Sequence, residues 1–111
     1  MIDKSQPGLW VYPSGREVIQ TKTLAGRAIL AERRMKAWRD SMGLCCLCSL
    51  TVQAWDETLE HLTSKGAGGG KHDDRQSNLG ISHRHGNQAK GSMSLEQYLK
   101  LPLDVRVRNC K

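Results

Sequence analysis

Two cysteines separated by two residues are the clearest candidate for a metal site in this chain. Cys45 and Cys48 flank Cys46, whereas the fourth cysteine, Cys110, lies far along the chain. Three cysteines within four residues are poorly spaced for a disulfide framework, and a Cys-x-x-Cys pair is typical of half a zinc site. A redox-active pair would need a βαβ context, which the sequence does not show. We therefore predict that Cys45 and Cys48 bind zinc and that Cys110 is a free thiol without a role.

Three further features follow the cysteine pair in order along the chain. Glu60 and His61 are adjacent within a predicted extended segment over residues 58–62. A glycine-containing loop over residues 65–74 then leads to Asn78-Leu79. The segment over residues 83–91, which reads His-Arg-His-Gly-Asn-Gln-Ala-Lys-Gly, closes the series. The loop precedes neither a Lys-Ser/Thr pair nor a helix, which excludes a phosphate-binding P-loop.

This order of features resembles the HNH endonuclease family, whose active centre is a ββα-metal fold. The family pattern has an acidic residue or His followed by His on the first strand, a glycine-containing loop, and Asn-Leu at the second strand. An Asn or His then opens the helix, commonly followed by Lys-Gly. The matching residues here are Glu60-His61, Gly68-Gly69, Asn78-Leu79, Asn87 and Lys90-Gly91. The resemblance covers residues 43–92, just under half of the chain.

The resemblance implies that the protein hydrolyses DNA phosphodiester bonds with His61 as the general base. A neutral imidazole can accept a proton from water near physiological pH. Asn78 is then expected to fix the loop and orient His61. Glu60 and Asn87 are expected to bind one Mg²⁺ or Mn²⁺, since such hard cations favour oxygen ligands. Adjacent side chains on a strand point to opposite faces, so the strand must end or twist at Glu60-His61 if both are to reach one phosphate.

The second half of the zinc site is less regular. Family members with a zinc ribbon carry a second Cys-x-x-Cys pair just before the final Asn, and those positions are His83 and Gly86 here. Glycine has no ligand atom, so the prediction is a Cys₂His₂ zinc site in which His85 joins His83, Cys45 and Cys48. The alternative is that the two cysteines are buried thiols and that His83 or His85 serves the catalytic cation.

An amphipathic helix is predicted over residues 23–42. Thr21 or Thr23 can cap its start, and Gly43 can end it. Its other face is basic, and is either solvated or in contact with phosphates. The apolar side chains recur every three or four residues and are expected to pack in the core; they are Leu24, Ala28, Ala31, Met35, Trp38 and Met42.

The whole chain is predicted to form one domain of the α+β class. An N-terminal extension over residues 1–22 contains a short extended piece and precedes the basic helix. The ββα-metal core over residues 43–92 is expected to be stapled by zinc, with a strand over residues 78–83 and a helix over residues 84–91. Residues 93–111 form a C-terminal helix and a basic tail. Within them, Ser94 caps a helix that Pro102 ends, and residues 105–108 form an edge strand or ordered tail.

The charge of the chain suits a polyanionic partner. It has 17 Lys and Arg against 11 Asp and Glu, a formal net charge of +6. Such a balance favours binding to nucleic acid, although contacts to the DNA backbone carry little sequence information. We therefore expect low specificity or a protein partner, and a homodimer for double-strand cleavage. The residues expected to contact DNA are Arg84, Lys90, Arg34 and Lys65.

No run of 18 apolar residues is present, so a membrane partner is not expected. The first residues lack an apolar signal stretch, and the expected location is the cytoplasm of a bacterial or phage-infected cell. The alternative to a nuclease is a non-catalytic zinc-stabilised module that binds nucleic acid.

Overall fold

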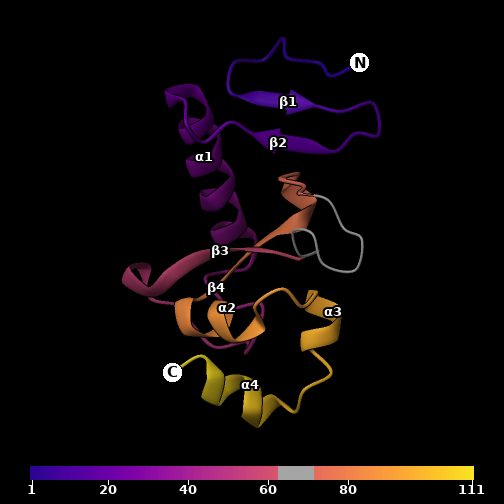
Figure 1. Ribbon diagram of the computed structural model, residues 1–111. Coiled ribbons are helices and arrows are strands. Elements are labelled where there is room, and N and C mark those ends of the chain that lie inside the picture. The colour runs from indigo at the N-terminus through magenta and orange to yellow at the C-terminus, as the bar shows by residue number, and fades with distance from the viewer. Residues whose placement is uncertain (63–71) are drawn as a thin grey trace.

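The computed structural model describes residues 1–62 and 72–111, which have a mixed α/β architecture (Figure 1). Four α-helices and two small antiparallel sheets are present in these residues. The N-terminal sheet lies at one end of the molecule and the C-terminal helix at the other, with the second sheet between them (Figure 1). The longest dimension is 45 Å.

The N-terminal segment forms a hairpin. Strand β1 (Leu9–Val11) pairs with β2 (Glu17–Ile19), and Leu9 lies opposite Ile19 in the register. Both of these side chains are buried. Gly15 has a φ of +90° in the connecting turn, a conformation that glycine adopts without strain. The sequence predicted the first strand and did not predict the second.

Helix α1 (Leu24–Asp40) agrees with the helix predicted over residues 23–42. The Thr23 side chain caps its start by accepting a hydrogen bond from the Gly26 backbone N–H at 2.9 Å. Gly43, with a φ of +74°, follows the helix in the left-handed conformation typical of a residue just beyond a helix end. The N-cap at Thr23 is therefore confirmed, whereas the first left-handed residue after the helix is Met42, with a φ of +56°, and Gly43 comes one residue later.

Most of the apolar stripe of α1 does not pack in the core as predicted; of its members, Trp38 is partly buried against the core. Its most exposed members are Leu24, Met35 and Met42, at 79%, 60% and 82%. The helix instead turns the small residues Gly26 and Ala37 inward. An ion pair of 2.6 Å between Arg33 and Glu17 holds the same side of the helix against β2. The small side chains allow a close backbone approach, which the larger residues of the stripe would prevent.

The central sheet and the helix after it follow the predicted order of strand, strand and helix. Strand β3 (Glu57–His61) pairs antiparallel with β4 (Leu79–His83), and α2 (Arg84–Lys90) follows at once. Glu60 lies opposite Gly80, and β3 ends at His61. Short 3₁₀ helices precede the two strands: η1 (Ala54–Asp56) and η3 (Gln76–Asn78).

The C-terminal part contains two short helices. Ser94 and Gln97 form a capping box at the start of α3 (Leu95–Tyr98), as the predicted cap at Ser94 requires. The prediction of an edge strand or tail over residues 105–108 is wrong, because these residues belong to helix α4 (Leu103–Asn109). In this helix the Arg106 guanidinium donates to the Leu101 and Leu47 carbonyls at 3.0 and 2.8 Å, which ties α4 to the turn after α1.

The buried core gathers around cysteine side chains. Three of its eight members are cysteines; the eight are Ala37, Cys45, Leu47, Cys48, Val52, Ile81, Tyr98 and Cys110. The chain contains no Phe, so the apolar core is small for its length, and small cores gain most from a metal staple. No helix in the described residues is long and apolar enough to span a membrane.

Candidate metal centre and candidate active site

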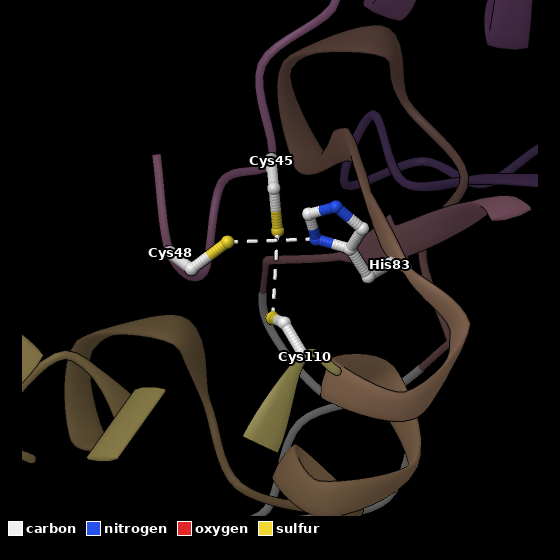
Figure 2. A group of neighbouring side chains, drawn as sticks. All are labelled: Cys45, Cys48, His83 and Cys110. Atoms are coloured by element: carbon white, nitrogen blue, oxygen red, sulfur yellow. Dashed lines mark hydrogen bonds between the residues drawn. The ribbon is translucent and has the colours of Figure 1, made fainter. Parts of the chain in front are cut away.

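Four side chains from three separate parts of the chain converge on one point. Cys45 and Cys48 lie in the turn after α1, His83 is the last residue of β4, and Cys110 directly follows α4. Their sulfur and nitrogen ligand atoms all lie within 4.8 Å of one another. Figure 2 shows the three thiols and the imidazole ring pointing toward a common centre. We refer to these residues as the Cys₃His group.

The distances within the Cys₃His group suit a tetrahedral zinc ion. The Sγ atoms of Cys45 and Cys110 are 4.0 Å apart, and Cys48 Sγ lies 3.4 Å from His83 Nδ1. With the usual zinc bond lengths, a tetrahedron requires about 3.8 Å between two sulfurs and about 3.5 Å between sulfur and nitrogen. Adjustments of a few tenths of an ångström would satisfy both values. The group could therefore hold a metal such as zinc, and the predicted ligation by Cys45, Cys48 and His83 is geometrically sound.

The neighbours of the Cys₃His group orient its ligand atoms. The Leu47 backbone N–H donates to Cys45 Sγ at 3.3 Å within the turn. The Nε2–H of His83 donates to the Thr51 carbonyl at 3.1 Å, which leaves Nδ1 of the ring with the lone pair that faces Cys48. A second ring nitrogen held by a backbone carbonyl is the usual support for a metal-binding histidine.

Burial sets the protonation of the thiols when no metal is bound. Burial raises the pKa of both Cys48 and Cys110, and the neighbouring Cys45 adds to the rise at each. Without a metal, Cys48 and Cys110 therefore remain protonated thiols at pH 7. Zinc binding would release the thiol protons, so the affinity for zinc falls as the pH is lowered.

Cys110, and not His85, is the fourth member of the group. His85 is exposed, and its Nδ1–H donates to the Lys111 carbonyl at 2.6 Å. Position 86 explains the substitution, because a Cβ built on Gly86 would collide with the Cys110 sulfur. The thiol thus fills the space that a side chain at position 86 would enter. Sequence reasoning missed Cys110 because it lies 62 positions beyond Cys48, although a half-site that lacks ligands was itself a reason to consider every remaining cysteine.

A separate cavity lies between β3 and α2. Its volume is about 420 Å³, and it brings together Glu60, His61, Asn87 and Lys90, with Leu59, Gly91 and Ser92 completing the lining. Because β3 ends at His61, the two adjacent residues Glu60 and His61 both border this one cavity. Four residues singled out by the sequence pattern therefore share one site, which we call the β3–α2 pocket.

Within the pocket, Glu60 forms a buried ion pair with Lys90. The Lys90 Nζ atom lies 2.8 Å from Glu60 Oε1, and both side chains are at most 3% exposed. Burial raises the pKa of Glu60, while the hydrogen bond and charge of Lys90 oppose the rise. Lys90 also donates to the His61 carbonyl at 3.4 Å. In this structure Glu60 is thus partnered by an ammonium group.

His61 is oriented by Asp74, which the sequence did not single out. The Nε2–H of His61 donates to Asp74 Oδ1 at 2.7 Å, and the Nε2–H of His72 donates to Asp74 Oδ2 at the same distance. Burial disfavours the charged form of Asp74, but these bonds and one from the Ile19 N–H outweigh it and lower its pKa to about 2. No spacing rule pointed to this residue, because the contact joins a loop to a strand end.

The remaining predicted residues lie elsewhere. The Asn78 side chain donates to the Asp73 carbonyl at 2.8 Å, so it fixes the base of the loop, whereas the contact to His61 is made by Asp74. Arg34 pairs with Glu57 at 2.8 Å. Arg84 borders a different cavity and lies apart from the β3–α2 pocket. Lys65 falls outside the described residues, as do Gly68 and Gly69.

Comparisons of the chain with protein-family models, with curated proteins and with solved structures found no match.

The Cys₃His group leads to a prediction that separates Cys110 from His85. We expect the Cys₃His group of the untagged protein to bind one zinc ion, and Cys110→Ser to lose that ion. The loss should lower the free energy of unfolding by about 4 kcal/mol, the linkage value for a ligand present at about 1,000 times its dissociation constant. Elemental analysis and thermal unfolding measure the two effects. His85→Ala is the matched control and should keep its zinc; a variant pair with the opposite behaviour would restore His85 as the ligand.

The buried ion pair leads to a prediction about stability. Lys90→Met should lower the free energy of unfolding at pH 7 by about 3–5 kcal/mol, because it leaves the Glu60 carboxylate buried and unpaired. The loss should shrink as the pH falls toward 5, since a protonated Glu60 costs less to bury. Denaturant unfolding measures both. The control is Lys36→Met, which removes an exposed pair with Asp40 and should change stability by less than about 0.5 kcal/mol. Equal effects from the two variants would contradict the buried role of Lys90.

Proposed function

We propose that this protein is a metal-dependent endonuclease or nickase that hydrolyses phosphodiester bonds in DNA. The observation that carries the proposal is the β3–α2 pocket, where Glu60, His61 and Asn87 border one cavity. These are the residues that the resemblance to HNH endonucleases assigns to the reaction. The net charge of +6 adds support, because a basic protein attracts a polyanionic substrate.

His61 is the proposed general base. Its Nε2–H is engaged with the Asp74 carboxylate, so the Nδ1 atom carries the lone pair that can accept a proton. Asp74 would also stabilise the imidazolium that forms when His61 takes a proton from the attacking water. In this proposal Asp74 is a positioning residue, and Asn78 contributes by holding the loop that carries it.

Glu60 and Asn87 are the proposed ligands of one Mg²⁺ or Mn²⁺. A carboxylate and an amide oxygen suit a hard cation that keeps several of its waters. Such an ion, when bound, would neutralise charge on the phosphate and on the departing oxygen. Because Lys90 occupies Glu60 Oε1, cation binding requires the ammonium to release or share the carboxylate. Lys90 would then be available to the phosphate.

One observation favours the alternative, a zinc-stabilised module that binds nucleic acid without cutting it. Trp55 is 77% exposed and borders a cavity of about 400 Å³ together with Arg84, His85 and Lys111. An exposed indole beside cationic side chains can stack on a base while the cations contact phosphates. In this alternative the Glu60–Lys90 pair is structural.

The test is cleavage of supercoiled plasmid with added Mg²⁺ or Mn²⁺, and without either ion. We expect metal-dependent conversion to open-circular DNA, and a rate at least about 100-fold lower for His61→Ala, because that variant lacks the base. His85→Ala is the matched control and should cut at the rate of the unaltered protein. Omitting the cation is preferable to chelation, since a chelator would also remove zinc from the Cys₃His group.

Linear product would indicate cleavage of both strands. If the protein shifts the plasmid on a gel but leaves it supercoiled with either ion, the nuclease proposal fails and the binding module is favoured. Full activity in His61→Ala would leave a nuclease but contradict the assigned base.

A further inference from the structure

A second set of potential metal ligands surrounds the Nε2 atom of His61. The ligand atoms of His61, His72 and Asp74 all lie within 4.8 Å of one another. Each imidazole meets a different oxygen of the same carboxylate at 2.7 Å, and the ring centroids are 5.3 Å apart. We call these residues the His–Asp–His group. They belong to the end of β3 and to the described residues just before η3.

We propose that the His–Asp–His group is a second metal site, which binds a borderline dication such as Zn²⁺. Two imidazole nitrogens and one carboxylate oxygen are ligands that suit zinc and similar first-row metals, whereas Mg²⁺ favours an all-oxygen set. Three protein ligands leave a coordination position open to water. This distinguishes the site from the Cys₃His group, whose four ligands close the coordination sphere.

The distances require little rearrangement. Around a tetrahedral zinc ion, a nitrogen and an oxygen ligand lie about 3.3 Å apart. The 2.7 Å distance between the oxygen that binds the metal and its imidazole Nε2 must therefore open by about 0.6 Å, and the metal replaces the proton on each Nε2. Each proton can move to Nδ1 of the same ring, because a neutral imidazole carries one proton on either nitrogen.

The backbone that carries two of the ligands is held on both sides. Arg16 donates to the His72 carbonyl at 2.7 Å, and Arg33 donates to the Asp74 carbonyl at 2.7 Å. The Asp74 N–H in turn donates to the Glu17 carbonyl at 2.7 Å. The hairpin and α1 thus fix residues 72–74 relative to the sheet. Fixed ligands lower the ordering cost of metal binding.

Accessibility also suits an exchangeable metal. The His72 side chain is 34% exposed, whereas those of His61 and Asp74 are 16% and 5% exposed. A metal can therefore enter from the His72 side and meet an anionic ligand at the base of the site. Because the side chains of His61 and Asp74 are already largely removed from water, their electrostatic attraction for a cation is stronger.

A metal at this site would change the chemistry of His61. With Nε2 bound to the ion and the proton on Nδ1, the ring has no lone pair for a proton from water. Zinc should then inhibit cleavage, so that the same histidine serves either the reaction or the second metal. This consequence rests on the proposed function, whereas the binding itself does not.

The closing experiment measures metal stoichiometry. The untagged protein, with zinc already in the Cys₃His group, is titrated with Zn²⁺ by calorimetry, and separately with Co²⁺ by absorption. We expect one further equivalent for the unaltered protein, and a cobalt spectrum without thiolate charge-transfer bands. His72→Ala should lose this equivalent and keep the zinc of the Cys₃His group. His72 is partly exposed, so this variant is expected to fold.

His85→Ala is the matched control and should retain the second equivalent, because it removes a histidine outside the group. No second equivalent in the unaltered protein, or one that persists in His72→Ala, would overturn the site. The outcome is independent of nuclease activity, since it is read from binding. With an active protein, plasmid cleavage in Mg²⁺ should fall when the second zinc equivalent is added; binding without this fall would contradict the inhibition and leave the site intact.

Discussion

The convergence of Cys45, Cys48, His83 and Cys110 is the constraint on which the rest of this small protein depends. The three thiols belong to the buried core itself, in a chain that has no Phe to fill the same space. The turn after α1, the end of β4 and the end of α4 all meet at this point, so a metal there would join the N-terminal and C-terminal parts of the sequence. Without the metal, the same point holds free cysteines whose weak hydrogen bonds contribute much less than coordinate bonds.

The metal centre and the β3–α2 pocket are linked through one helix. Helix α2 begins immediately after the ligand His83, and its Gly86 faces the Cys110 sulfur. Farther along the same helix, Asn87 and Lys90 border the pocket. Whatever fixes the start of α2 therefore also fixes the residues that face Glu60. Loss of a metal from the Cys₃His group should therefore loosen the pocket, although no member of that group borders it.

Local patterns in the sequence predicted the parts of the structure that depend on neighbouring residues. The limits of α1, its Thr23 cap, the order of β3, β4 and α2, and the pair Cys45 and Cys48 are all features of short spacing. The sequence predictions that proved wrong concern contacts between segments far apart in the chain. Cys110 takes the place predicted for His85 because tertiary packing brings the end of α4 against Gly86. Most of the apolar stripe of α1 is exposed because ion pairs and small residues determine which side of the helix is buried. Asp74 was missed for the same reason, since its partners lie in β2, β3 and the loop.

The two buried carboxylates near His61 have different partners: Glu60 pairs with Lys90, and Asp74 accepts from two imidazoles. This difference determines which kind of cation each carboxylate can bind. Burial raises the pKa of Glu60 despite Lys90, so its charge is costly and a cation that replaces the ammonium must supply at least an equal attraction. Asp74 has a pKa of about 2 because two imidazoles and a backbone N–H donate to it, so its charge is already stabilised. A hard cation would therefore have to compete with Lys90 at Glu60, whereas a borderline metal would replace only two protons at Asp74. In the proposed reaction, a metal bound to His61 Nε2 would prevent this histidine from acting as a base, whereas a cation at Glu60 would leave its Nδ1 lone pair available.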